Sequence, residues 1–79
     1  MLDEALAHLV RGIVDNPDDV DVTERSGRRG RSLDVRVHPD DMGRVIGRAG
    51  RTATALRTVI TALNGDRGVR IDFLDVAER

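Results

Sequence analysis

The 79-residue chain has no cysteine, no lysine, no tryptophan and no tyrosine. Without cysteine it forms no disulfide and has no thiolate chemistry, which is compatible with a reducing cytoplasm. No run of about eighteen apolar residues occurs, so we expect no transmembrane helix. The acidic residues near the start of residues 1–13 are unlike a signal peptide. These absences predict a cytoplasmic protein that folds as one small domain over residues 1–79.

Aromatic residues are nearly absent, since Phe73 is the only one in the chain. We expect this ring to belong to the core. The scarcity of aromatic side chains excludes the stacking platforms with which many single-strand-binding proteins hold bases. Any discrimination between bases would then come from aliphatic contacts and backbone hydrogen bonds.

Catalytic and cofactor-binding patterns are missing as well. The two histidines, His8 and His38, have no partner at the spacing of metal ligands. The adjacent acids Asp40 and Asp41 have the ordinary place of aspartates at a helix N-terminus. Neither the glycine pattern of a P-loop nor that of a dinucleotide-binding fold occurs. We therefore expect no enzyme activity, no catalytic residue, no cofactor and no metal ion.

The net charge of −1 hides a strong asymmetry along the chain. Residues 25–57 carry nine arginines against three aspartates, whereas residues 1–24 carry one arginine against seven acids. This distribution predicts one face that attracts anions, although a mixed, solvated surface would have the same composition. Every basic residue is arginine, the side chain whose planar fork best matches a phosphate.

Hydrophobic spacing predicts six elements in the order α-β-β-α-α-β. Apolar residues recur at helical spacing from residue 2 to residue 13, and Asn16-Pro17 stops that helix. Strands of alternating residues are expected at 20–23, 33–37 and 69–73, the first two forming a hairpin around a turn at 26–30. A short helix opens at 38–41 and carries Met42, and a long helix covers 51–63 before Asn64-Gly65.

The most informative segment is the loop Gly47-Arg48-Ala49-Gly50 between the last two predicted helices. A helix N-terminus offers unpaired N–H groups and a partial positive charge, which suit a phosphate. Glycines without Cβ atoms let the backbone approach a ligand closely. Because Arg44, Arg48 and Arg51 add full charges, we expect this loop to bind a sugar-phosphate backbone.

A glycine pair at this spacing is weak evidence alone, since it occurs three times in the chain. The pairs at 27–30 and 65–68 lie in a predicted hairpin and after a helix, where turn chemistry explains them. Only the middle pair lies between two helices. The arginine-rich segment 26–31 is either a second phosphate contact or a solvated turn.

The predicted long helix has more apolar surface than one core stripe requires. Ala53, Leu56, Ile60 and Leu63 form one arc, opposite a polar arc with Arg51 and Arg57. The residues beside the apolar arc are Ala55, Val59 and Ala62. This edge either packs on the sheet or forms the contact with another subunit.

Residues 41–51, with Val45 and Ile46 before the glycine loop, resemble the signature of the KH nucleic-acid-binding domain. The whole chain resembles the small, single-domain bacterial KH proteins of the KhpA family. The resemblance implies an α/β type II KH fold, with a three-stranded mixed sheet packed by helices on one face. It also implies that the loop clamps about four nucleotides of single-stranded RNA.

By position, the resemblance assigns nucleic-acid binding to a set of residues in and around the loop. These are Gly47, Arg48, Ala49, Gly50, Arg44, Arg51, Val45, Ile46 and Ala53. Strand residues such as Leu33 and Val35 would complete a groove for the bases. Many KH motifs carry a larger aliphatic residue where Ala53 stands, which implies a shallower groove here.

The same resemblance implies partners. Proteins of this family self-associate and pair with a larger KH protein of the Jag/KhpB type, acting as RNA chaperones or post-transcriptional regulators linked to growth and division. Two other functions stay open at this point. One is a protein-interaction or dimerisation module with secondary nucleic-acid binding. The other is a helix-hairpin-helix duplex DNA binder, although that motif normally uses GxG and needs no strands.

Overall fold

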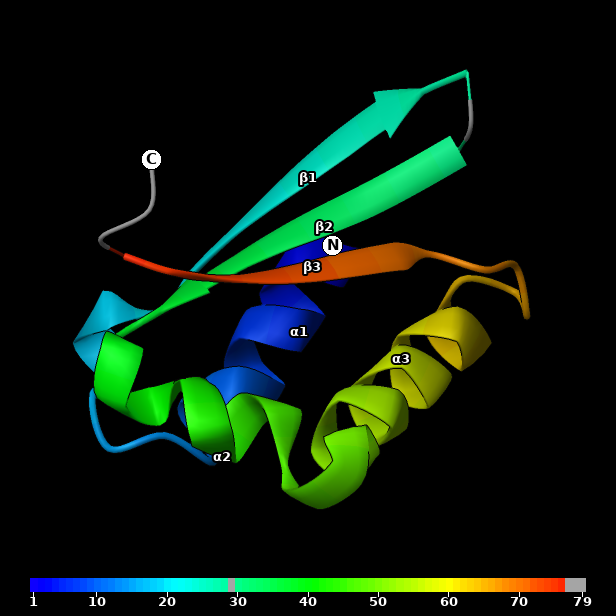
Figure 1. Ribbon diagram of the computed structural model, residues 1–79. Coiled ribbons are helices and arrows are strands. Elements are labelled where there is room, and N and C mark those ends of the chain that lie inside the picture. The colour runs from blue at the N-terminus through cyan, green and yellow to red at the C-terminus, as the bar shows by residue number, and fades with distance from the viewer. Residues whose placement is uncertain (29, 77–79) are drawn as a thin grey trace.

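The computed structural model describes residues 1–28 and 30–76, and its elements follow one another in the predicted order (Figure 1). The helices are α1 (Leu2–Arg11), α2 (Met42–Ile46) and α3 (Arg51–Leu63), and the strands are β1 (Asp21–Gly27), β2 (Gly30–Val37) and β3 (Arg70–Asp75). Short 3₁₀ turns, named η1 to η3, cover Pro17–Asp19, Pro39–Asp41 and Arg48–Gly50.

The three strands form one mixed sheet with β2 in the centre. β1 pairs with β2 in the antiparallel direction, and β3 pairs with β2 in the parallel direction. The helices lie together on one face of this sheet (Figure 1). The predicted α/β class, the mixed sheet and the one-sided helical layer are therefore confirmed.

Strict alternation along β2 explains the one-sided layer. Leu33, Val35 and Val37 are fully buried toward the helices, while the residues between them point to the other face. The buried side chains belong to one core cluster with Leu6 and Val10 of α1 and with Leu56 and Ile60 of α3. The core is thus a single layer between the sheet and the helices.

Several predicted boundaries are wrong, including those of β3, which covers Arg70–Asp75 rather than 69–73. Helix α1 ends at Arg11 rather than residue 13, and Gly12 is its C-cap with angles still in the right-handed helical region. The N–H of Ile13 donates to the carbonyl oxygen of Val10 at 3.0 Å, so the chain continues in a tighter turn. The hairpin strands are longer than expected, since Gly27 pairs with Gly30 and most of the predicted turn belongs to the sheet. Polar residues still form the ladder there, because its hydrogen bonds come from the backbone. Of the predicted turn, residue 29 lies outside the described residues.

A buried carboxylate ties the segment after α1 to the start of α2. Asp41 is 1% exposed and accepts hydrogen bonds from the backbone N–H of Asp15 at 3.1 Å and that of Asn16 at 3.0 Å. The side-chain Nδ2 of Asn16 donates to the same carboxylate at 3.1 Å. Burial alone would raise the pKa of Asp41, but these hydrogen bonds outweigh it and lower the pKa below its ordinary value.

We expect Asp41→Asn to lower the thermal midpoint at neutral pH by on the order of 10 °C, because the amide NH₂ would face N–H donors. A lowered pKa means that the ionised form stabilises the fold above pH ~4 and that this stability is lost as the pH falls further. Between pH 5 and pH 2 the thermal midpoint of the Asn variant should therefore fall less than the midpoint of wild type. Thermal melts across that range measure both effects.

Asp40→Asn is the matched control, because the neighbouring Asp40 side chain is 85% exposed. It makes the same chemical change one residue away from the buried carboxylate, and it should leave the midpoint nearly unchanged. Equal effects of the two substitutions would contradict the structural role of Asp41.

Candidate nucleic-acid interface

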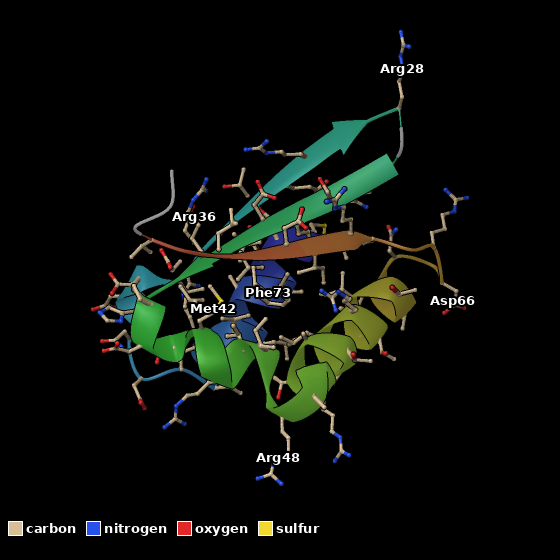
Figure 2. The ribbon with its side chains drawn as sticks, viewed as in Figure 1. Arg28, Arg36, Met42, Arg48, Asp66 and Phe73 are labelled. Carbon is tan, nitrogen blue, oxygen red and sulfur yellow. The ribbon has the colours of Figure 1, made fainter. Side chains whose placement is uncertain are left out.

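The connection between α2 and α3 is a tight loop with left-handed backbone. Gly47 has φ 76° and ψ 171°, Ala49 has φ 55° and ψ 25°, and Gly50 has φ 75° and ψ 16°. Glycine adopts such angles freely, whereas the alanine between them is strained. Figure 2 shows Arg48 pointing away from the body of the protein at this corner. The predicted glycine loop thus forms an exposed corner.

The two glycines of the loop meet different constraints. A Cβ atom on Gly47 would come within 2.8 Å of the backbone nitrogen of Thr52, closer than real Cβ atoms approach. The Gly47 N–H donates to the carbonyl oxygen of Gly43 at 2.9 Å, which closes α2. A Cβ atom on Gly50 would meet open space. Gly47 is therefore required by packing and backbone angle together, and Gly50 by backbone angle alone.

The N-terminus of α3 has no side-chain cap. Gly50 stands at the N-cap position, and none of the described side chains bonds to the first-turn N–H groups. Inside the loop, the Gly50 N–H donates to the Gly47 carbonyl at 3.2 Å and the Arg51 N–H to that of Arg48. The remaining first-turn donors and the partial positive charge of the helix face the exposed corner, which favours an anion.

The three arginines predicted to bind the sugar-phosphate backbone differ in whether they form ion pairs within the protein. Arg48 and Arg51 are exposed, and within residues 1–28 and 30–76 their side chains have no ion-pair or hydrogen-bond partner. Arg44 pairs with Asp15 at 3.2 Å, and both side chains are well exposed. Such surface pairs contribute little stability, so an incoming phosphate competes with Asp15 at small cost. Two unpaired guanidinium groups therefore flank the loop.

Four of the residues predicted to line or complete an apolar groove are buried. Leu33, Val35 and Val45 are 0% exposed and Ala53 is 2% exposed, so they support the surface from beneath. The alternation of β2 already requires this for Leu33 and Val35, and Val45 and Ala53 are the buried positions of α2 and of the first turn of α3. Of the predicted lining residues, Ile46 is only partly buried.

The apolar surface beside the loop contains two residues that sequence reasoning missed. Met42 of α2 and Phe73 of β3 are partly buried against the core, as is Ile46, and α2 packs on β3. Met42 lies four residues before Ile46, so the helical spacing placed both on one face. Phe73 was expected to belong to the core and packs against it while partly exposed, and no sequence signal placed β3 next to α2.

Arg57 covers the ring of Phe73. Its guanidinium carbon lies 5.8 Å from the ring centroid, and Nη2 donates to the carbonyl oxygen of Ile71 at 3.4 Å. A cation over an aromatic face contributes about 0.5–1 kcal/mol at exposed sites. The polar arc of α3 thus reaches β3, and a positive charge lies over the one aromatic ring.

The apolar edge of α3 is not covered within the protein. Ala55 and Ala62 are exposed, and Val59 is 43% exposed. Leu63, expected in the buried arc, is 59% exposed at the last position of the helix. Packing of this edge on the sheet is thus excluded. None of the helices in the described residues is long and apolar enough to cross a membrane.

The family model for the KhpA/KhpB KH domain matches residues 3–73. The RNA-binding protein KhpA of Streptomyces coelicolor is 71% identical over 76 residues, which are 96% of this chain and 95% of the relative. The proteins of the same name in Mycobacterium tuberculosis and Halalkalibacterium halodurans are 62% and 47% identical, over 91% and 86% of this chain and 89% and 92% of the relatives.

Proposed function

The chain belongs to the KhpA family of KH-domain proteins, a non-enzymatic family, and we propose that it binds single-stranded RNA through the loop of residues 47–50. One observation carries the proposal. The loop forms an exposed corner at an uncapped helix N-terminus, between the unpaired side chains of Arg48 and Arg51. The relatives carry the name RNA-binding protein.

The chemistry of the loop favours the backbone of a single strand. A phosphate at the start of α3 accepts hydrogen bonds from first-turn N–H groups, and the two arginines add charge-assisted bonds. The bases of the same strand then lie against the partly buried side chains of Met42, Ile46 and Phe73. A duplex keeps its bases stacked inside, so it would satisfy only the phosphate contacts.

The direct test compares an eight-nucleotide single-stranded RNA with a duplex of the same sequence. We expect tighter binding of the single strand and a fall in affinity with salt, with a slope near −2 in log–log form for about three phosphate contacts. Tighter binding of the duplex would favour the helix-hairpin-helix mode and overturn the proposal. The affinity for single-stranded DNA of the same sequence, measured in the same assay, shows whether the ribose hydroxyl contributes to binding.

We extend the proposal to the setting of this activity. RNA chaperoning or post-transcriptional regulation in the cytoplasm, together with a second KH protein of the Jag/KhpB type, is what membership of the family supports. A small domain with few aromatic contacts binds RNA with weak sequence discrimination, which suits a chaperone. The partner protein would share RNA with this chain or cover its exposed apolar edge.

Self-association through α3 is the second part of this proposal. The edge formed by Ala55, Val59 and Ala62 is exposed, and Leu63 extends it. Small side chains permit close approach of two helices, and burying Val59 and Leu63 supplies apolar area. A homodimer through this edge leaves the loop at 47–50 open.

We expect the mass of the protein to rise with concentration, and Val59→Glu to keep it monomeric by placing a charge in the interface. Thr54→Glu is the control, since it adds the same charge to an exposed position on the polar arc of α3. Sedimentation at several concentrations measures the difference. Equal masses of both variants, or a wild type that stays monomeric, would exclude this interface. Dimerisation without RNA binding would favour the interaction-module alternative.

A further inference from the structure

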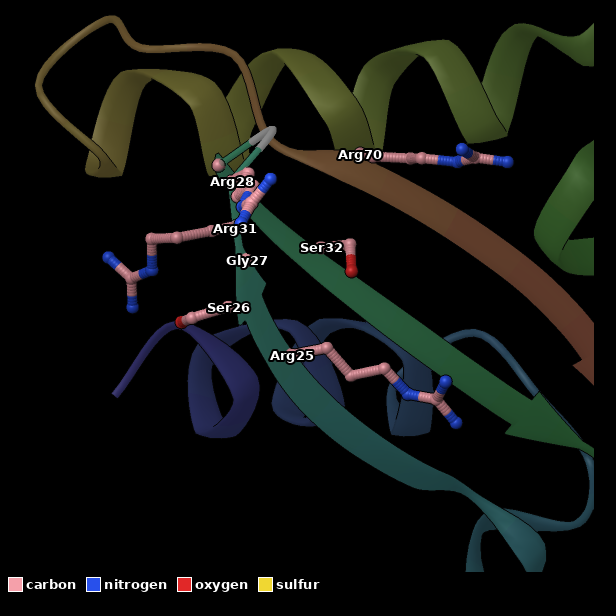
Figure 3. Close-up of a pocket in the computed structure, with 8 residues that line it drawn as sticks. Arg25, Ser26, Gly27, Arg28, Arg31, Ser32 and Arg70 are labelled. Atoms are coloured by element: carbon pink, nitrogen blue, oxygen red, sulfur yellow. The ribbon is translucent and has the colours of Figure 1, made fainter.

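The face of the sheet opposite the helices carries a row of three register partners. Arg25 of β1 pairs in register with Ser32 of β2, and Ser32 pairs with Arg70 of β3. Neighbouring strands lie about 4.8 Å apart, so two long arginines flank one small hydroxyl side chain. The result is a depression lined by Arg25, Ser32 and Arg70, with Arg28 of the hairpin turn at its border. Figure 3 shows Arg25 and Arg70 extending in the same direction on either side of Ser32.

Two aspartates on the same face of the sheet, in the adjacent row of register partners, form ion pairs with Arg25 and Arg70. Each pair uses the Nε atom of the arginine. Nε of Arg25 lies 3.0 Å from Asp34, and Nε of Arg70 lies 3.3 Å from Asp72. Asp34 and Asp72 are themselves register partners, so their mutual repulsion favours both pairs. The pairs orient the two guanidinium groups, and the terminal nitrogens make no other bond among the described residues. The two arginine side chains are 66% and 76% exposed.

The nearby Arg31 shows the opposite arrangement. Its Nε and Nη2 both donate to Glu24, at 3.0 and 2.8 Å, and its Nη1 donates to Asn64 at 2.9 Å. All three nitrogens are engaged, so this arginine ties the hairpin to the end of α3. Arg28 is exposed, with no partner in the part of the chain that the structure describes. Among the described residues around the hairpin, the arginines whose terminal nitrogens are free are therefore Arg25, Arg28 and Arg70.

We propose that this depression, called the sheet-face notch (Arg25, Arg28, Ser32 and Arg70), binds a phosphate of a second segment of RNA. The notch offers the six N–H₂ ends of three arginines and one hydroxyl around a single depression, and such donors suit the oxygens of a phosphodiester. Arg28 and Arg48 lie at opposite ends of the molecule (Figure 2). A short strand held by the loop at 47–50 does not reach the notch, whereas a longer strand wraps to it. The proposal rests on RNA binding by that loop.

The test uses two single-stranded RNA probes, of four and of roughly sixteen nucleotides. Arg28→Gln/Arg70→Gln removes two charges from the notch and keeps Arg25, whose loss would leave the nearly buried Asp34 unpaired. We expect the variant to bind the long probe roughly tenfold more weakly than wild type. Its salt slope for that probe should be about 0.7 smaller, the value for one lost phosphate contact. Affinity for the short probe should not change.

The control is Arg11→Gln, which removes a charge beside the acids Asp3, Glu4 and Asp21, away from the notch. It should affect neither probe. Equal weakening of both probes by the notch variant, or no weakening of either, would overturn the proposal. So would a notch variant that changes only the mass of the protein, since the occupant would then be acidic protein surface. Failure of wild type to bind the short probe would count against the loop instead, so the two failures are distinguishable.

Discussion

Replacing Arg48 and Ala49 together by aspartate is expected to weaken binding of single-stranded RNA by at least about 100-fold. The double variant places two negative charges at the proposed phosphate site and removes one unpaired guanidinium. Both positions are on the exposed corner of the loop, and the glycines remain. Aspartate tolerates the left-handed backbone at position 49 better than most residues do. Fluorescence anisotropy with a labelled eight-nucleotide RNA measures the loss.

Two controls separate the charge at the loop from other effects. The first is a thermal melt, in which the double variant should unfold within a few degrees of wild type. The second is Thr54→Asp/Thr58→Asp, which adds two charges to exposed positions further along α3. That variant should weaken binding several-fold at most. If a folded Arg48→Asp/Ala49→Asp protein bound RNA as tightly as wild type, the loop would not be the clamp.

Gly47→Ala is expected to have the largest effect on stability among the loop substitutions. A backbone at φ 76° and ψ 171° is accessible almost only to glycine. The added Cβ would also press on Thr52 at the start of α3, so α2 and α3 would have to shift apart. We expect a loss of about 3–4 kcal/mol, or roughly 15–25 °C in the thermal midpoint. Chemical denaturation measures the free energy of unfolding.

Gly50→Ala is the matched comparison, three residues along the same loop. Its φ of 75° and ψ of 16° are left-handed helical, and its Cβ would meet open space. The cost should be only about 1 kcal/mol. Equal destabilisation by the two substitutions would mean that the contact with Thr52 does not constrain the loop.

Elements with a clear period could be predicted from the sequence. Helix α3 begins and ends where the spacing and Asn64-Gly65 placed it, and the alternation of Leu33, Val35 and Val37 marked the buried face of β2. The loop at 47–50 was found from its glycines and from its place between two helices. Local sequence signals were enough to predict these elements, because a helix cap, a turn and a hydrophobic stripe are properties of residues close together in the sequence.

Features that depend on contacts distant in sequence could not be predicted. Asp41 was expected to serve only a helix N-terminus, but its carboxylate binds the segment at 15–16, some 25 residues away. Val45 was assigned to a surface that its burial excludes. The notch also depends on residues far apart in the sequence, since the parallel pairing of β2 with β3 brings Arg70 into the same row as Arg25. Sequence alone left the order of the strands open.

The central claim is that RNA contacts the protein at the loop of residues 47–50 and the first turn of α3. Titration of ¹⁵N-labelled protein with an eight-nucleotide single-stranded RNA, followed by amide chemical shifts, tests this claim most directly. The account predicts that the largest and saturating shifts belong to residues 47–53, with smaller ones at Met42 and Phe73. Shifts confined to the apolar edge of α3 or to the open face of the sheet, with residues 47–53 unmoved, would contradict it.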